Sequence, residues 1–262
     1  MNSEYTGIRF IRLTIEYVGT QYQGWQTQLS GLTIQDVISS AVFVITGEKS
    51  KLIAASRTDS GVHALGQVAA FSTRSSLPTD TILRALNANL PPDLRILDAE
   101  EIDSEFHPRY AALKKSYFYI VEKSQKQSVF VHPFSWRVPV HLDLEQMNIA
   151  AALLLGRHDF SSFRGAGCGA KTTIRTVHAI SVNGYESLDF MTAGLRGDFI
   201  KIRIEADAFL RHMVRNIVGT LVEVGKGRLS PDAVLKILHS CNRKMAGPTA
   251  PAKGLFLEKV FY

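Results

Sequence analysis

The order of the hydrophobic patterns in the first hundred residues constrains the fold most strongly. Residues 10–18 alternate apolar and polar side chains, which is the period of a half-buried strand. An apolar stripe at helical spacing follows over 34–46, with Thr33 as its expected N-cap. Two short apolar runs, a helix that Thr79 is expected to cap and a strand over 94–102 complete the order strand–helix–strand–strand–helix–strand. This order is typical of a ferredoxin-like or RRM-like plan, in which helices cover one face of an antiparallel sheet and the other face can meet RNA.

The second half of the chain repeats the mixture of strands and helices. Tyr117 and Tyr119 lie on one face of an expected strand over 114–121, and we place the middle of the chain near residue 106. The chain is therefore predicted to be an α/β (α+β) protein with halves 1–105 and 106–262. The remaining expected elements are helices over 143–155, 209–224 and 230–238 and strands over 176–182 and 199–206.

Charge and cysteine content restrict the function further. The chain has 262 residues, 30 Lys and Arg against 24 Asp and Glu, and a formal net charge of +6, which favours a polyanionic partner such as RNA. Its two cysteines are far apart in sequence, which favours a reducing compartment. We find no apolar segment long enough to cross a membrane and no secretory signal, so we expect a soluble, cytoplasmic protein.

One carboxylate stands out in a loop between two short apolar runs. Asp59 follows Arg57 by two residues and precedes the turn at Ser60-Gly61. A carboxylate near a guanidinium can stay ionised and keep an oxygen for chemistry, so Asp59 is a candidate nucleophile or general base. The alternative is an ordinary surface turn in which Asp59 bonds to backbone amides.

Aromatic side chains suggest how a base could be held. Tyr22 and Trp25 lie in a loop rich in amides, where they could stack on bases or could cover the core beneath. Tyr117 could likewise face a ligand or pack within its sheet.

These segments together resemble the tRNA pseudouridine synthase A family. The resemblance runs through nearly the whole chain and is strongest in the catalytic motif of that family. The matching stretches are Ser56-Arg57-Thr58-Asp59-Ser60-Gly61-Val62-His63-Ala64, Tyr22-Gln23-Gly24-Trp25-Gln26, Lys115-Ser116-Tyr117-Phe118-Tyr119, Phe209 to Asn216, and Thr249-Ala250-Pro251-Ala252-Lys253-Gly254-Leu255.

The resemblance implies a fold, an activity and a set of roles. It implies the pseudouridine synthase fold, whose two ferredoxin-like halves share a mainly antiparallel sheet around a central RNA-binding cleft, with helices on the outer faces. The implied reaction isomerises uridine at positions 38, 39 and 40 of the tRNA anticodon stem-loop, without a cofactor, in a homodimer. Asp59 would be the catalytic carboxylate, Arg215 would pair with it, and Tyr117 would stack on the uracil. Arg57 would assist extrusion of the nucleotide.

Other basic segments are candidates for RNA contacts. Arg211 and Arg215 are four apart in an expected helix and so should share a face, with Arg211 free to contact phosphate. The glycine-rich stretch 165–172 nearly spells a nucleotide-binding P-loop, but Ala170 replaces the glycine before the lysine, and no apolar strand precedes it. We therefore expect this loop to contact RNA phosphates.

Two other functions are weighed against the synthase. A non-catalytic RRM-like protein would fit the charge and the aromatics, but an RNP1-type strand is missing. An N-glycoside hydrolase would need a second carboxylate or a calcium site near Asp59. The histidines show no metal-ligand spacing, so no metal is expected, and His63 is interpreted as structural. Whether Asp59 attacks C1′ or acts through a glycal route stays open.

Overall fold

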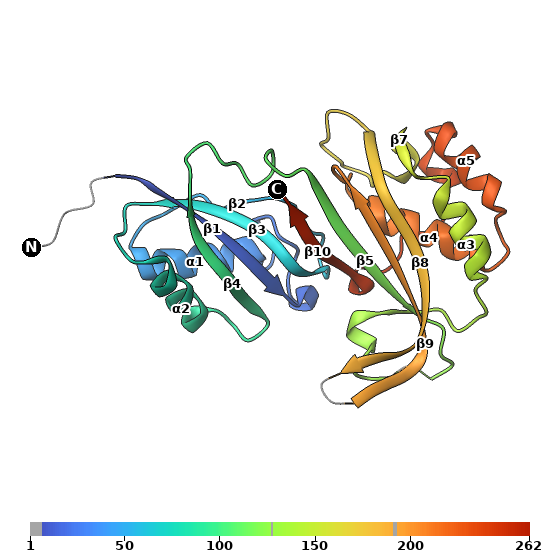
Figure 1. Cartoon of the computed structure of the whole chain (residues 1–262), viewed down its shortest axis with the longest axis horizontal. Helices are drawn as coiled ribbons and strands as arrows, with labels where there is room; N and C mark the ends of the chain where they lie inside the picture. Colours follow the sequence, from blue (N-terminus) through green and yellow to red (C-terminus); the bar gives the residue numbers. More distant parts are fainter. Residues whose placement is uncertain (1–6, 127, 191–192) are drawn as a thin grey trace, which may run out of the picture. The chain divides into compact units, whose positions relative to one another are not determined.

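A computed structural model describes residues 7–126, 128–190 and 193–262 and divides the chain into two compact units (Figure 1). The first unit comprises Met1–Leu113 and Leu257–Tyr262, and the second comprises Lys114–Phe256. The last six residues therefore belong with the beginning of the chain. The catalytic roles assigned to halves 1–105 and 106–262 stay a prediction.

The first unit is built on an antiparallel sheet, as expected. Its central strand β1 (Arg9–Tyr17) lies between β3 (His63–Thr73) and β4 (Leu94–Ile102), with Leu13 opposite Ala69 on one side and Ala99 on the other. The short strand β2 (Ile53–Ala54) and the C-terminal strand β10 (Leu255–Phe261) also adjoin β3. The order strand–helix–strand–strand–helix–strand is thus confirmed.

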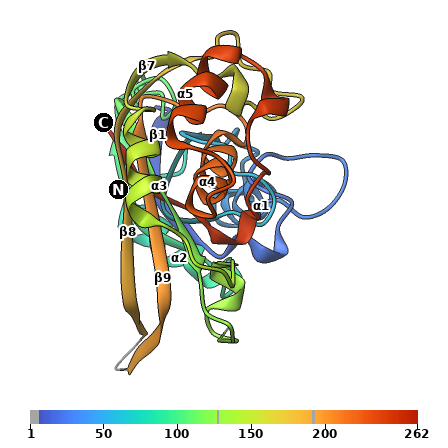
Figure 2. The ribbon, with the colours of Figure 1, turned by 90° about the vertical axis from the view of Figure 1, so that its right-hand side faces the viewer.

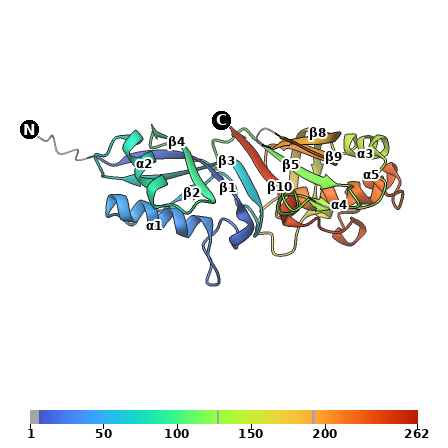
Figure 3. The ribbon, with the colours of Figure 1, turned by 90° about the horizontal axis from the view of Figure 1, so that it is seen from below.

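The two helices of the first unit begin in different ways. Helix α1 (Ile34–Thr46) starts as predicted, because the Thr33 hydroxyl accepts a hydrogen bond from the Asp36 amide at 3.2 Å. Helix α2 (Thr79–Asn89) does not, because the N-cap is Pro78 and Thr79 is already helical. Figure 3 shows α1 along one side of the strands. The fully buried residues of this unit include Ile11, Leu13 and Ile15 from β1, Ile34 and Ile38 from α1, and Ile82 and Leu86 from α2.

The second unit contains the sheet order β5–β9–β8–β7, again antiparallel, with β6 parallel to β5. Figure 2 shows α3 and α4 on the same side of the long β8–β9 ribbon. The mainly antiparallel α/β class is therefore confirmed. The strands are β5 (Lys114–Glu122), β6 (Trp136–Arg137), β7 (Gly156–Asp159), β8 (Ile174–Phe190) and β9 (Ala193–Ala206), and the helices are α3 (Leu144–Ala152), α4 (Met213–Gly225) and α5 (Pro231–Ser240).

The start of α4 corrects the sequence prediction. The helix begins at Met213 rather than Phe209, because His212 adopts a left-handed conformation with φ of 61°. Arg211 therefore precedes the helix and does not share a helical face with Arg215. The apolar spacing continued through Leu210 because that side chain is buried in a turn, where its carbonyl accepts the Met213 amide at 3.0 Å.

The ends of several other elements also differ from prediction. Strands β8 and β9 are longer than 176–182 and 199–206, since the outer part of the ribbon is mostly exposed and lacks a strict apolar alternation. Helix α3 stops at Ala152, and α5 continues to Ser240. No helix in the described ranges is long and apolar enough to cross a membrane. Short 3₁₀ turns occupy Gly19–Gln21, His132–Phe134, Ser161–Phe163, Arg243–Met245 and Ala252–Gly254.

Candidate active site

Asp59 lies in a tight turn between β2 and β3, which we call the carboxylate turn (residues 56–62). The Val62 amide donates to the Asp59 carbonyl oxygen at 3.1 Å, and Gly61 has φ of 76°, a conformation that favours glycine. Thr58 beside it is buried, whereas Asp59 is half-buried. The turn thus fixes the backbone on both sides of a carboxylate that keeps partial access to solvent.

The turn packs against residues 19–25 at distances that require glycine. A Cβ atom on Gly19 would lie 2.0 Å from the Val62 carbonyl oxygen, and one on Gly24 would lie 2.7 Å from the Thr58 carbonyl oxygen. The Trp25 amide donates to that same Thr58 oxygen at 3.1 Å. These glycines let two loops share backbone hydrogen bonds, so the position of Asp59 depends on both.

Neutral polar side chains hold the carboxylate turn in place through hydrogen bonds. The Tyr17 and Thr58 hydroxyls are 2.8 Å apart, and the fully buried Gln67 donates to the Ser56 carbonyl oxygen at 2.8 Å. Burial raises the pKa of Tyr17 well above its usual value, despite hydrogen bonds to Thr58 and Gln67. His63 accepts a hydrogen bond from the Gly19 amide at its Nδ1 atom, at 3.1 Å, in keeping with a structural role.

The other residues of the first unit that were predicted to contact RNA differ in their exposure to solvent. Arg57 is exposed and available to a ligand. Tyr22 and Trp25 are only 3% and 2% exposed, and the Tyr22 hydroxyl donates to Asp93 at 2.6 Å. The Trp25 ring lies 6.2 Å from the ring of Tyr17. Both aromatics therefore cover the core beneath the loop in this structure, which is the alternative that the sequence had left open, and their contact with RNA bases stays a prediction.

Strand β5 holds the predicted stacking residue of the second unit. The edge of the Tyr117 ring meets Phe209 with 4.9 Å between centroids, and Tyr117 is 5% exposed. Tyr119, on the same face of the strand, is fully buried and donates through its hydroxyl to the Pro251 carbonyl oxygen at 2.7 Å. Burial raises the pKa of Tyr119 above its usual value, and the nearby charge of Arg215 opposes this only in part.

Arg215 joins the first turn of α4 to residues 247–254, which we call the closing loop. Its Nε donates to the Ala250 carbonyl oxygen at 2.7 Å, and the Ala250 amide donates back to the Arg215 carbonyl oxygen at 3.1 Å. A Cβ atom on Gly219 would lie 1.7 Å from the Pro248 carbonyl oxygen, so the helix must carry glycine there. The closing loop therefore determines where this guanidinium points.

A polar network behind Arg215 was missed from the sequence. Arg243 donates to the Gly247 carbonyl oxygen at 2.9 Å and to the Asn216 side chain at 3.0 Å, while Thr249 donates to Asn216 at 2.6 Å. Desolvation lowers the pKa of Arg243. Asn216 within the apolar stripe of α4 was the available signal, because a fully buried amide needs partners.

Arg211 is attached to the glycine-rich loop. The Gly165 amide donates to the Arg211 carbonyl oxygen at 2.8 Å, and Arg211 Nη1 donates to the Ala166 carbonyl oxygen at 3.1 Å. A Cβ atom on Gly165 would lie 2.7 Å from the His212 ring. The exposed Arg211 side chain and the loop thus form one basic, backbone-rich surface.

The structure therefore groups the predicted site residues by unit. Asp59 and Arg57 belong to the first, and Tyr117, Arg211 and Arg215 belong to the second. A half-buried carboxylate on a rigid turn can attack an electrophilic carbon or accept a proton. A guanidinium can stabilise an anion, and a tyrosine can hold a base.

Comparison with known proteins identifies the family. The family model described as tRNA pseudouridine synthase matches residues 13–111 and 150–262. The tRNA pseudouridine synthase A of Acetivibrio thermocellus is 46% identical over 97% of this chain and 100% of its own length. That of Myxococcus xanthus is 45% identical over 96% of this chain and 91% of its own length. A solved Cbf5–Nop10–Gar1 complex aligns with 81% of this chain and 45% of that chain at 13% identity, with a TM-score of 0.29 that supports no conclusion. On the sequence matches, the chain belongs to the tRNA pseudouridine synthase family.

Proposed function

We propose that this protein isomerises uridine to pseudouridine at positions 38, 39 and 40 of the tRNA anticodon stem-loop. The observation that carries the proposal is the carboxylate turn around Asp59, packed against Gly19 and Gly24, in a chain that matches a tRNA pseudouridine synthase A over 97% of its length. A role in RNA binding without catalysis would leave this turn unexplained.

The reaction breaks the bond between uracil N1 and ribose C1′ and forms a bond between C5 and C1′. The proton on C5 is lost to solvent, and N1 gains one, so no oxidant or cofactor is needed. Asp59 stabilises the electron-poor ribose, either by attack at C1′ or by removing a proton on a glycal route. Arg215, which the family resemblance pairs with the catalytic carboxylate, is proposed to orient Asp59.

The remaining residues hold the RNA. Tyr117 stacks on the uracil, and Arg57 occupies the space that the extruded nucleotide leaves. Arg211 and the loop 165–172 contact phosphates, because backbone amides and a guanidinium suit phosphate oxygens.

Release of tritium from tRNA labelled at uridine C5 tests the activity directly. Isomerisation frees the label, whereas binding alone does not. Mass mapping of tRNA from a deletion strain tests the positions, and we expect pseudouridine to disappear from 38, 39 and 40. Loss of pseudouridine only at other positions would contradict this proposal.

A single substitution can distinguish stacking by the Tyr117 ring from proton transfer by its hydroxyl. We expect Tyr117→Phe to retain tRNA affinity, because the ring remains, and to lose most turnover, because the hydroxyl takes part in proton transfer at C5. Binding and tritium release are measured on the same preparation. Turnover equal to wild type would assign Tyr117 a packing role alone.

Assembly and location complete the proposal. The protein acts as a cytoplasmic homodimer in which two protomers present one long basic surface to a single tRNA. Sedimentation at micromolar concentration, with and without tRNA, tests the assembly, and a fully active monomer contradicts it. Fractionation of cells tests the location.

A further inference from the structure

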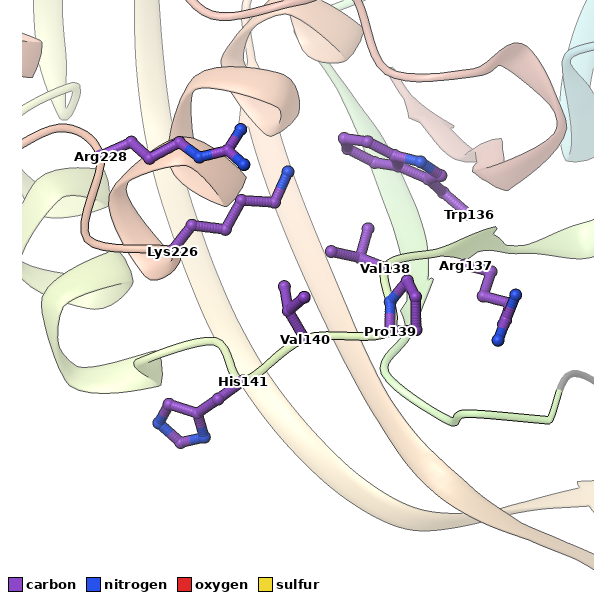
Figure 4. Close-up of a pocket in the computed structure, with 8 residues that line it drawn as sticks. All are labelled: Trp136, Arg137, Val138, Pro139, Val140, His141, Lys226 and Arg228. Carbon is purple, nitrogen blue, oxygen red and sulfur yellow. The ribbon is translucent and has the colours of Figure 1, made fainter.

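A pocket of about 320 Å³ opens on the second unit, and its lining residues have no role in the site described above (Figure 4). One wall is the segment 136–141, and the other is the chain just after α4, with Lys226 and Arg228. Figure 4 shows the charged ends of Lys226 and Arg228 extending toward the space in front of Trp136, whereas His141 points away. We propose that this pocket binds one nucleotide of the tRNA outside the reacting position, with its base against Trp136 and its phosphate on Lys226 and Arg228.

The walls of the pocket are held by backbone hydrogen bonds. The Val138 amide donates to the Glu122 carbonyl oxygen at 2.8 Å, and the Asp143 amide donates to the Gly225 carbonyl oxygen at 2.9 Å. The Gln125 side chain donates to the Pro139 carbonyl oxygen at 3.0 Å. A cavity between fixed walls loses little entropy when a ligand enters.

The two cations are not needed to cap α4. Backbone amides already satisfy the last carbonyl groups: Lys226 donates to Val222 at 3.0 Å, Gly227 to Val224 at 2.8 Å, and Arg228 to Glu223 at 3.0 Å. The side chains of Lys226 and Arg228 are therefore free of that task and can serve a ligand.

Lys226 and Arg228 keep an excess positive charge after Glu223, the carboxylate that both contact, is counted. Glu223 accepts from Lys226 at 2.8 Å and from Arg228 at 3.1 Å. Burial would raise the pKa of Glu223, but these two cations outweigh it and lower the pKa, so Glu223 is ionised at neutral pH. One carboxylate between two cations leaves an excess positive charge, and Arg228, 68% exposed, can turn toward a phosphate without leaving Glu223 unpaired.

The aromatic wall selects a nucleotide over a simple anion. Lys226 Nζ lies 5.8 Å from the centre of the half-exposed Trp136 ring, so a cation and a ring face adjoin. Stacking on an aromatic ring next to basic side chains is the usual way in which proteins hold unpaired RNA bases. A volume of about 320 Å³ is near the lower end for small-ligand pockets, which suits one nucleotide and excludes a duplex.

The pocket also adjoins the parts of the second unit that hold Arg215. The rings of Trp136 and Tyr119 meet edge to face with 6.4 Å between centroids, and the Tyr119 hydroxyl bonds to Pro251 in the closing loop. Only the Tyr119 side chain would therefore separate an RNA strand held at Trp136 from the closing loop. This inference rests on the proposed function, because it takes tRNA as the ligand.

Iodide quenching of tryptophan fluorescence tests occupancy of the pocket. The protein has two tryptophans, and Trp25 is only 2% exposed, so iodide should report on Trp136. We expect quenching in the free protein, its suppression by unlabelled tRNA, and loss of the signal in Trp136→Phe. Quenching that tRNA leaves unchanged would overturn the proposal. Absence of quenching without RNA would do so too, because another part of the protein would then cover Trp136.

Charge variants test the phosphate contacts. We expect Lys226→Gln and Arg228→Gln each to raise the Kd for tRNA about three- to tenfold at 0.1 M salt and to reduce the slope of log Kd against log salt by about one. Lys236→Gln, which removes an exposed cation from α5, is the matched control and should behave as wild type. A double variant with the Kd and salt slope of this control would refute the phosphate contacts. A changed sedimentation coefficient in the RNA-free variants would assign the pocket to protein contact instead.

Failure of this inference is distinguishable from failure of the proposed function. Tritium release by the wild-type protein tests the reaction and makes no reference to Trp136. Suppression of quenching without tritium release would keep the pocket as an RNA site and reject the synthase activity. Tritium release with unaffected pocket variants would keep the activity and reject the pocket.

Discussion

The carboxylate turn and the closing loop are both packed against glycine, yet they are supported by different kinds of side chain. Tyr17 bonds to Thr58 of the carboxylate turn and Gln67 bonds to Ser56, both through neutral side chains, and His63 directly after the turn accepts from the Gly19 amide. The closing loop is held instead by guanidinium groups that donate to its carbonyl oxygens, from Arg215 to Ala250 and from Arg243 to Gly247.

The difference follows from what each segment carries. A cation beneath Asp59, added to the proposed partner Arg215, would occupy the second carboxylate oxygen that the reaction needs, so neutral donors and acceptors suit the turn better. The closing loop carries no carboxylate, and a planar guanidinium with several N–H groups can satisfy its carbonyl oxygens. In the proposed mechanism, the first unit thus uses different residues for support and for chemistry, whereas Arg215 of the second unit does both.

Asp59→Asn should have the largest effect on activity and the smallest on fold. We expect tritium release to fall at least about a thousandfold, because the amide is a poor nucleophile and base of the same size. The tRNA Kd and thermal midpoint should change little. Asp80→Asn, an exposed acid in α2 of the same unit, is the matched control. Turnover near wild type would remove Asp59 from the mechanism.

Gly219→Ala should cause the largest loss of stability. The new Cβ would lie 1.7 Å from the Pro248 carbonyl oxygen, which is backbone and cannot rotate away. We expect about 3 kcal/mol of destabilisation and a displaced Arg215. Denaturant unfolding measures the first effect and kcat the second. Gly7→Ala, which meets no atom within 4 Å, should change neither. Equal stability of the two variants would show that the closing loop is loosely held.

Gln67→Glu would place a charge in the neutral support of the carboxylate turn. Gln67 is 0% exposed, so the new carboxyl should have a folded-state pKa above its unfolded value. A raised pKa of an acid makes the penalty small below about pH 4 and larger as pH rises, and we expect about 2 kcal/mol at pH 8. Unfolding at pH 5 and pH 8 measures the difference. The exposed Gln26→Glu should show no such dependence, and a flat profile for Gln67→Glu would contradict a neutral support.

Tyr119→Phe should have the smallest effect on stability among these variants. It removes the hydroxyl that donates to the Pro251 carbonyl oxygen but keeps the ring that packs on Gly254. We expect a loss of about 1 kcal/mol, the usual contribution of one hydrogen bond. The measurement is thermal unfolding compared with Phe118→Leu, which alters the opposite face of β5. A loss above about 3 kcal/mol would mean that this bond holds the closing loop as strongly as the arginines do.

Local patterns in the sequence predicted much of the fold. Helix α1 has the predicted bounds because its Thr33 cap and its final Gly47 are local signals, each read within a few residues. The start of α4 could not be predicted in this way. His212 is left-handed, and the apolar spacing through Leu210 comes from a buried turn rather than from a helix.

Some features of the candidate site were likewise predictable from local sequence, and others were not. The nine residues from Ser56 to Ala64 were sufficient to single out Asp59, and their resemblance to a family motif supplied its expected role. The exposure of Tyr22 and Trp25 was left undecided, because an aromatic ring in a polar loop can face either way. Only the packed structure, with the Tyr22 hydroxyl bonded to Asp93, shows that these rings are covered.

The sequence by itself thus determined the class of fold and the family and singled out the candidate carboxylate Asp59, since these depend on residue types and short spacings. Tertiary structure alone decided which residues support that chemistry. Gln67 bonds to Ser56 eleven residues away, and Arg243 bonds to Asn216 twenty-seven residues away. Contacts of this kind form only when distant segments pack and a buried polar group must find a partner, which no local pattern specifies.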